Sequence, residues 1–370
     1  MNEPVLPLKV QHAAMQYSID QTKANFDKNK ELSNLLKEIG EKRTKEINGL
    51  LGSKAKEYRE FLEKSREIAR TMQPLFRATP EGRKIKSQFQ KTRLDESNKF
   101  MKSLGINGND FKSILSKYQD ESKSIIEKTR AIEGSLELDV GAIPPDVVHQ
   151  DPDSPWLSFH PPYFYSHGDV YILWDPDLSA GPSSHYSRPE GSHYENYLTG
   201  EMSCRNNIQI IASFDHETQL VATSSTILIY FQMPASGRLN IWSQWQCVES
   251  SYGGSLSNDF LGYSDATIMQ SSRLVMSVGE QLGVEEAYFR LLDYGRHTSD
   301  DVQWSDNMIM PGEYRTFNLV TDIPYSAGQW VLMRAGIFDV QDVVLDDMTY
   351  SSSIKNSWRL NGVWVSSINP

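Results

Sequence analysis

The sequence predicts an α+β multidomain protein, in which an N-terminal antiparallel helical bundle or coiled coil precedes a C-terminal antiparallel β-sandwich that is jelly-roll-like. Three observations predict it. Lys355 is the only lysine from Gly134 onward, and all eight tryptophans lie at or after Trp156. Apolar residues recur at helical spacing before this region, whereas after it they alternate or form short runs between turn signals.

The charge of the chain changes sign at the same place. Residues 1–133 hold 27 Lys+Arg and 19 Asp+Glu, a net of +8, while residues 134–370 hold 10 and 29, a net of -19; together they give -11. One uniform domain would not divide its charge in this way. We therefore expect a helical part at 1–133, a stiff Pro-rich linker at 134–156 and a β-sandwich at 157–370.

The helical part contains four predicted helices. Their ranges are 8–48, 53–73, 80–103 and 111–132, and Thr79-Pro80 forms a typical helix start. The fourth has the clearest apolar stripe, which runs from Phe111 to Ile132. Short connections favour antiparallel neighbours. Narrow stripes on long helices favour an elongated rod, and both a bundle within one chain and a coiled coil between chains stay open.

This helical part suggests a partner. A homo-oligomer is expected, because the apolar stripes must be buried against other helices. Nucleic acid is not the expected partner, since the basic residues of 54–70 are interleaved with Glu57, Glu60, Glu63 and Glu67 at ion-pair spacing.

The start of the chain and its cysteines bear on its compartment. MNEPVLPLKV lacks the cationic and apolar regions of a signal peptide. No run approaches the roughly 18 apolar residues that span a bilayer. We expect no transmembrane segment, and a protein that is cytoplasmic or exported without a cleaved signal peptide.

Cys204 and Cys247 are the only cysteines, and two buried free thiols are favoured over a disulfide.

The sandwich is predicted from short runs that are separated by turn signals. Residues 238–248 alternate, with Leu239, Ile241 and Trp245 on the face expected to be buried. The expected turns are Gly253-Gly254, Pro311-Gly312, Ser326-Ala327-Gly328 and Asn361-Gly362. The expected strands are 170–174, 207–214, 220–233, 238–248, 266–269, 273–278, 287–292, 314–320, 329–338, 343–345 and 363–368.

Aromatic residues are dense just after the linker, in a segment that we expect to be a loop. Exposed aromatic rings beside Asp, Asn and His can stack on sugar rings, although aromatic residues of a sandwich often lie in the core. The predicted ligand-binding residues are Trp156, Tyr163, Tyr165, Tyr186, Tyr194 and, from a later strand, Trp242.

Two metal sites are also considered. His185 and His193, together with Glu195 or with Asp175 and Asp177, could hold Zn²⁺ or a similar ion. Asp339 and Asp342, in expected loops at one end of the sandwich, could hold Ca²⁺ together with Asp346 or Asp347. No metal-binding signature supports either site. The alternative is hydrogen-bonded histidines and solvated carboxylates, with no cofactor.

No motif specifies a reaction. The sequence lacks G-x-S-x-G, a Walker A loop and G-x-G-x-x-G. We therefore expect a non-enzymatic binding or assembly protein. Its helices would oligomerise or act as a spacer, and its sandwich would bind a glycan, another cell-surface ligand or a copy of itself. Two alternatives stay open: a secreted toxin or effector with a β-sandwich targeting domain, and a sandwich-fold hydrolase.

Overall fold

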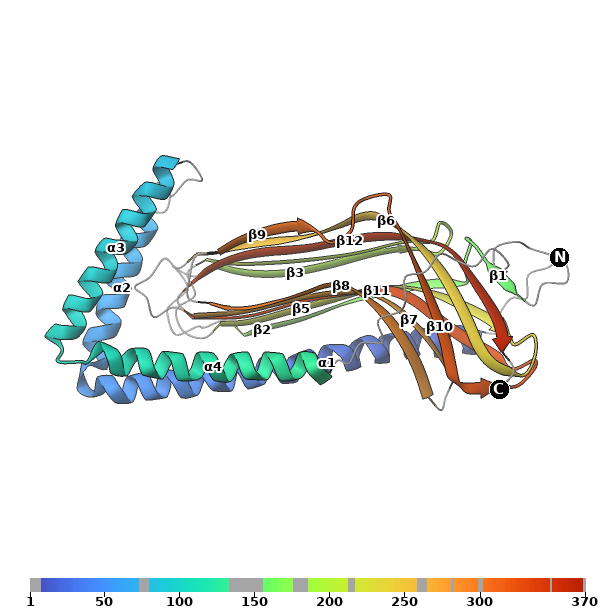
Figure 1. Ribbon diagram of the computed structural model, residues 1–370, viewed down its shortest axis with the longest axis horizontal. Helices are drawn as coiled ribbons and strands as arrows, with labels where there is room; N and C mark the ends of the chain where they lie inside the picture. The colour runs from blue at the N-terminus through green and yellow to red at the C-terminus, as the bar shows by residue number, and fades with distance from the viewer. Residues whose placement is uncertain are drawn as a thin grey trace.

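A computed structural model describes residues 8–72, 80–132, 156–175, 186–211, 217–257, 265–280, 283–298, 302–346 and 348–368. Two antiparallel sheets are stacked face to face, and two helices run along the outer face of one of them (Figure 1). The protein therefore contains the predicted helical N-terminal region and the predicted β-sandwich. Most of the predicted linker, residues 134–155, lies outside the described residues.

The helices are α1 (Leu8–Leu51), α2 (Ala55–Met72), α3 (Pro80–Ser103) and α4 (Gly108–Ile132), with a 3-10 turn at Gly52–Lys54. All four predicted helices are confirmed. None of the described helices combines the length and the apolar character that crossing a membrane requires.

Helices α1 and α4 lie antiparallel. Glu46 of α1 accepts hydrogen bonds from Lys117 Nζ at 2.5 Å and from Tyr118 Oη at 2.7 Å, whereas Leu36, earlier in α1, lies in one cluster with Ile125, later in α4. Helices α2 and α3 form a second hairpin that projects from one end of the sandwich (Figure 1).

The contacts of α1 do not form the free-standing rod that we expected. Phe26 of α1 stacks on Tyr171, with ring centroids 5.1 Å apart, and packs with Leu220 and Phe338 of the sheet. Leu35 on the same helix is 47% exposed. The helical region and the sandwich thus share an apolar interface.

The first sheet has seven strands in the order β10-β6-β12-β4-β3, with β1 paired to β12 and β9 paired to β6. The second has five strands in the order β2-β5-β11-β7-β8. The strands are β1 (Leu157–Phe159), β2 (Tyr165–Asp175), β3 (Tyr186–Asn196), β4 (Glu201–Ile211), β5 (Glu217–Gln232), β6 (Gly237–Ser257), β7 (Asp265–Glu280), β8 (Gly283–Thr298), β9 (Val302–Asn307), β10 (Tyr314–Tyr325), β11 (Trp330–Asp346) and β12 (Thr349–Ile368).

Burial follows from this layering. In β6 the residues from Gly237 to Cys247 alternate between buried and partly exposed, as predicted. In β5, residues 217–229 are all buried. One face of β5 meets the other sheet and the opposite face meets α1, so from Thr218 to Gln232 its sequence is apolar or uncharged on both faces.

Several strand predictions were wrong. The aromatic segment expected as a loop contains β3, and Gly253-Gly254 lies inside β6 instead of in a turn. Asn361-Gly362 lies inside β12, where the pairing with β6 shifts register between Leu360 and Gly362. The two short strands expected at 329–338 and 343–345 are one strand, β11. Asp339 and Asp342 therefore lie in a strand, not in the loops assigned to them.

The space between the sheets holds two apolar clusters with a polar layer between them. Along β4, Cys204 belongs to the first cluster and Ile208 to the second, and the fully buried Asn206 lies between them. Along β11, Asp339 separates Ile337 from Val343 in the same way. We define the polar layer as Asn206, Thr223, Ser250, Ser272, Asp339 and Asn356, all of them buried. Cys204 and Cys247 are buried free thiols, as predicted.

Candidate binding groove

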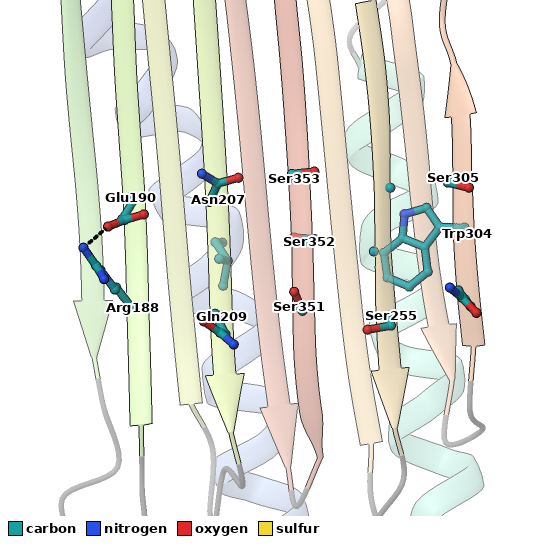
Figure 2. A pocket seen from close by; sticks show the side chains of 14 residues that line it. Arg188, Glu190, Asn207, Gln209, Ser255, Trp304, Ser305, Ser351, Ser352 and Ser353 are labelled. Carbon is teal, nitrogen blue, oxygen red and sulfur yellow. Dashed lines mark ion pairs between the residues drawn. The ribbon is translucent and has the colours of Figure 1, made fainter. Parts of the chain in front are cut away.

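A groove of about 540 Å³ crosses the outer face of the seven-stranded sheet (Figure 2). Two cross-strand rows of side chains line it, and both run over β3, β4, β12, β6 and β9. Strand register places Arg188, Gln209, Ser351, Ser255 and Gln303 in the first row. The second row consists of Glu190, Asn207, Ser353, Gly253 and Ser305.

The groove is hollow because the residues in its middle are small. Ser351 and Ser353 of β12 lie beside Ser255 and Gly253 of β6, and longer side chains stand on β3, β4 and β9. A side chain at Gly253 would meet Ser305, because its Cβ would lie 3.1 Å from that of Ser305. Glycine at this position therefore keeps the floor of the groove open.

Trp304 closes the edge of the sandwich beside the groove. Its Nε1 donates a hydrogen bond to Gln270 Oε1 at 2.9 Å, and its ring stacks on Tyr294 with centroids 5.2 Å apart. A Cβ at Gly254 would lie 2.5 Å from the Trp304 ring. Gly254 is therefore required for the indole to pass over β6.

The lining is polar and nearly neutral. Its charged groups are Arg188 and Glu190, which form an ion pair at 2.5 Å. The remaining polar groups are serine hydroxyls and the side-chain amides of Asn207, Gln209 and Gln303. A hydroxyl both donates and accepts, and an amide offers one group of each kind. Such a lining suits the hydroxyl groups of a ligand.

The predicted aromatic residues do not gather around this groove. Tyr194, 52% exposed on β3, lies on the same face of the sheet but two cross-strand rows away. Trp242 lies on the same face of β6 opposite Asn318 and Trp364, far along the strand from Gly253.

Three others lie elsewhere. Tyr163 is buried, and its hydroxyl donates to the Leu360 carbonyl at 3.0 Å. Tyr165 pairs with Leu228 in the five-stranded sheet, and Trp156 precedes β1. The side chain of Tyr186 lies outside the described residues.

The predicted metal ligands are also dispersed. His193 Nδ1 lies 2.9 Å from Glu195 Oε2 at the edge of the sandwich, while His185 lies outside the described residues. Asp339 and Asp342 are three residues apart on β11, so they point to opposite faces of the sheet. Within the described ranges, no three His, Cys, Asp or Glu residues are grouped closely enough to hold a metal ion.

Asp339 instead organises the polar layer. Its Oδ1 accepts hydrogen bonds from Ser272 Oγ at 2.6 Å and from Asn356 Nδ2 at 2.8 Å. Asn356 Oδ1 in turn accepts from Ser250 Oγ at 2.7 Å. Burial raises the pKa of Asp339 to about 7, although the hydrogen bonds from Ser272 and Asn356 act in the opposite direction. The carboxyl group is therefore protonated in mildly acidic solution.

Sequence reasoning missed the residues of the groove. Ser351-Ser352-Ser353 drew no assignment, and Gly253-Gly254 was assigned to a turn. One signal in the sequence could have located the groove: small polar residues recur in 250–257 and in 349–357. If both segments are recognised as neighbouring strands, these residues place small side chains side by side on the outer face of the sheet.

No protein-family model matches the chain, and no curated protein matches it. Some solved structures of carbohydrate-binding modules show a weak likeness. The module TmCBM61 in complex with β-1,4-galactotriose is 11% identical, with 53% of this chain and 88% of that chain covered and a TM-score of 0.16. The C-terminal CBM6 of LamC from Zobellia galactanivorans is 14% identical, with 57% and 99% covered and a TM-score of 0.15.

The family 11 module of Lic26A-Cel5E from Clostridium thermocellum is 9% identical, with 63% and 98% covered and a TM-score of 0.14. At TM-scores this low, we draw no functional conclusion for this chain from the likeness.

Proposed function

We propose that this protein is a non-enzymatic binding protein whose seven-stranded sheet holds a saccharide in the groove. The observation that carries the proposal is the lining itself, which offers hydroxyl and amide groups from four adjacent strands, β4, β12, β6 and β9, and one ion pair on β3. Each sugar hydroxyl can donate and accept, so both kinds of partner are needed around it. The volume of about 540 Å³ falls in the range of roughly 300–1,000 Å³ that is usual for ligand sites.

The same lining favours binding over hydrolysis. A glycosidase places two carboxyl groups across the bond that it cleaves. Among the described residues that line this groove, Glu190 is the one carboxylate, and Arg188 holds it in an ion pair. We therefore expect no turnover of a glycoside and ester panel at concentrations where saccharides bind. Turnover that a groove variant abolishes would establish the hydrolase alternative instead.

A glycan array followed by calorimetry tests the groove. Ser353→Phe places a large side chain in the middle of the hollow, so we expect it to abolish saccharide binding. Ser357→Phe is the matched control, because Ser357 faces outward from the same strand but pairs with Ser203 and Glu249 outside the groove. The control should keep the affinity of the unmodified protein. Absence of any binding on the array, or equal loss in both variants, would refute the proposal.

We further propose that the helical region joins copies of the chain. The α2–α3 hairpin projects beyond the sandwich (Figure 1), and Ile68 on α2 is 45% exposed. Light scattering of the full chain should give a multiple of its 42.1 kDa mass, and Ile68→Glu should lower that mass. A monomer at all concentrations would exclude this role.

A further inference from the structure

Several basic residues of the sandwich lie in or beside the groove. Residues 134–370 hold ten Lys and Arg residues. Four of these occupy outward-facing positions on β3, β4 and β12, in the part of the seven-stranded sheet that carries the groove: Arg188, Arg205, Lys355 and Arg359. The outward positions of β3, β4, β12, β9 and residues 249–257 of β6 hold three acidic residues, Glu190, Glu201 and Glu249. This face is therefore positive by one charge, although residues 134–370 have a net charge of -19.

Each arginine of this face has a glutamate partner. Arg188 pairs with Glu190 at 2.5 Å, Arg359 with Glu201 at 2.5 Å, and Arg205 with Glu249 at 3.6 Å. Within the described ranges, the ammonium of Lys355 has neither an ion pair nor a hydrogen bond. The only lysine from Gly134 onward is thus the cation of this face that no carboxylate neutralises.

Lys355 also stands directly beside another cation. It is the register partner of Arg205 on β4 and of Ser251 on β6. Like charges directly opposite each other destabilise an antiparallel pair. Glu249 offsets this only in part, because its 3.6 Å contact with Arg205 joins side chains that are 41% and 56% exposed, and exposed ion pairs contribute little. An anion bound between Lys355 and Arg205 would relieve the repulsion.

The two cations belong to the row that adjoins the groove. Lys355 follows Ser353 by two residues on β12, and Arg205 precedes Asn207 by two residues on β4. Successive outward residues of a strand are about 7 Å apart, a distance that lysine and arginine side chains can reach across. A ligand lying on Ser353 and Asn207 would therefore meet both cations at its end.

We infer that the ligand of the groove is an anionic saccharide, whose carboxylate or sulfate group binds between Lys355 and Arg205 while its hydroxyl groups occupy the groove. This inference rests on the proposed saccharide binding. The rest of the sandwich surface repels such a ligand through its excess of carboxylates, so the positive face directs the ligand to the groove. Arg205 exchanges its loose contact with Glu249 for the ligand anion.

The test uses the full chain and three tetrasaccharides of one length: a neutral hexose, a uronic acid and a sulfated hexose. Calorimetry in about 50 mM salt should show about tenfold tighter binding of at least one acidic probe than of the neutral one, because a charge-assisted hydrogen bond is added. The preference should shrink in about 300 mM salt, where screening is stronger. The two acidic probes distinguish carboxylate from sulfate.

Lys355→Gln should lose about tenfold in affinity for the acidic probe and leave the neutral probe unaffected, whereas Lys355→Arg keeps the preference. Equal binding of neutral and acidic probes, or an acidic preference that survives Lys355→Gln, would overturn the inference while leaving the groove as a saccharide site. Absence of binding by all three probes would refute the saccharide function itself. Thermal unfolding of each variant checks that the fold is intact.

Discussion

Asp339→Asn removes the one carboxyl group of the polar layer and keeps its shape. The wild-type side chain is fully buried and holds Ser272 and Asn356, so it links β11 with β7 and with β12 of the opposite sheet. An asparagine has no proton to lose and cannot become charged. The variant therefore isolates what ionisation of Asp339 does to the sandwich.

The direction in which pH changes the free energy of unfolding follows from the protonated and ionised states of the Asp339 carboxyl group. Folding raises its pKa from 3.8 to about 7, so between these values the folded chain binds a proton that the unfolded chain has released. The contribution of the protonated Asp339 to the free energy of unfolding is fully present below pH 4, declines as the pH rises, and is lost once the pH passes 7. Since one pKa unit corresponds to ~1.4 kcal/mol, the total loss is about 4 kcal/mol, of which about 2–3 kcal/mol falls between pH 5 and pH 8.

Urea unfolding monitored by circular dichroism measures this effect at pH 5, 6, 7 and 8. We expect the free energy of unfolding of the variant to gain about 2–3 kcal/mol relative to wild type over this interval. At pH 5 the variant should be the less stable of the two, because its amide nitrogen faces that of Asn356. Asp306→Asn, at an exposed position of β9, is the control and should follow the wild-type profile. Parallel profiles for wild type and Asp339→Asn would refute the reasoning.

Further predictions concern packing and access. Gly254→Ala should lower the free energy of unfolding in urea by about 1–3 kcal/mol, because the new Cβ would lie 2.5 Å from the Trp304 ring. Gly108→Ala is the control: nothing lies within 4 Å of its new methyl group, so it should be neutral or stabilising. Phe26→Ala should lower the free energy of unfolding by about 3–5 kcal/mol, because Phe26 packs α1 on the sheet, and Leu35→Ala on the exposed side of α1 should lower it by less than ~0.5 kcal/mol. Ellman's reagent should label neither cysteine in the native protein and both in urea, because burial shields the thiols and raises the pKa of Cys204 above its usual range and that of Cys247 to about 11.

The helices were predictable because their signals are local. Pro80 fixes a helix start, and the period of Phe111, Leu115, Tyr118 and Ser122 identifies the buried side of α4. What these stripes pack against was not predictable. Phe26 reaches Tyr171 and Leu220, which are far away in the sequence, and a stripe indicates only that a partner exists. The stripes of the helices alone favoured a rod, and the contacts of α1 with the sheet show that this prediction was wrong.

The groove was missed because the polar layer lies directly behind one end of it. On β12, Lys355 faces outward and Asn356 inward, and on β6 Ser251 and Ser250 do the same. In most strands of a sandwich, polar and apolar residues alternate, and this alternation identifies the strand. Where the core itself is polar, both faces carry polar residues and the alternation disappears. The segments 250–257 and 349–357 consequently look like turns or loops, although they form the central strands of the binding face. Asp339 and its partners therefore join the two sheets behind one end of the groove, and the second apolar cluster, with Ile208, Leu256 and Tyr350, packs behind the rest of it.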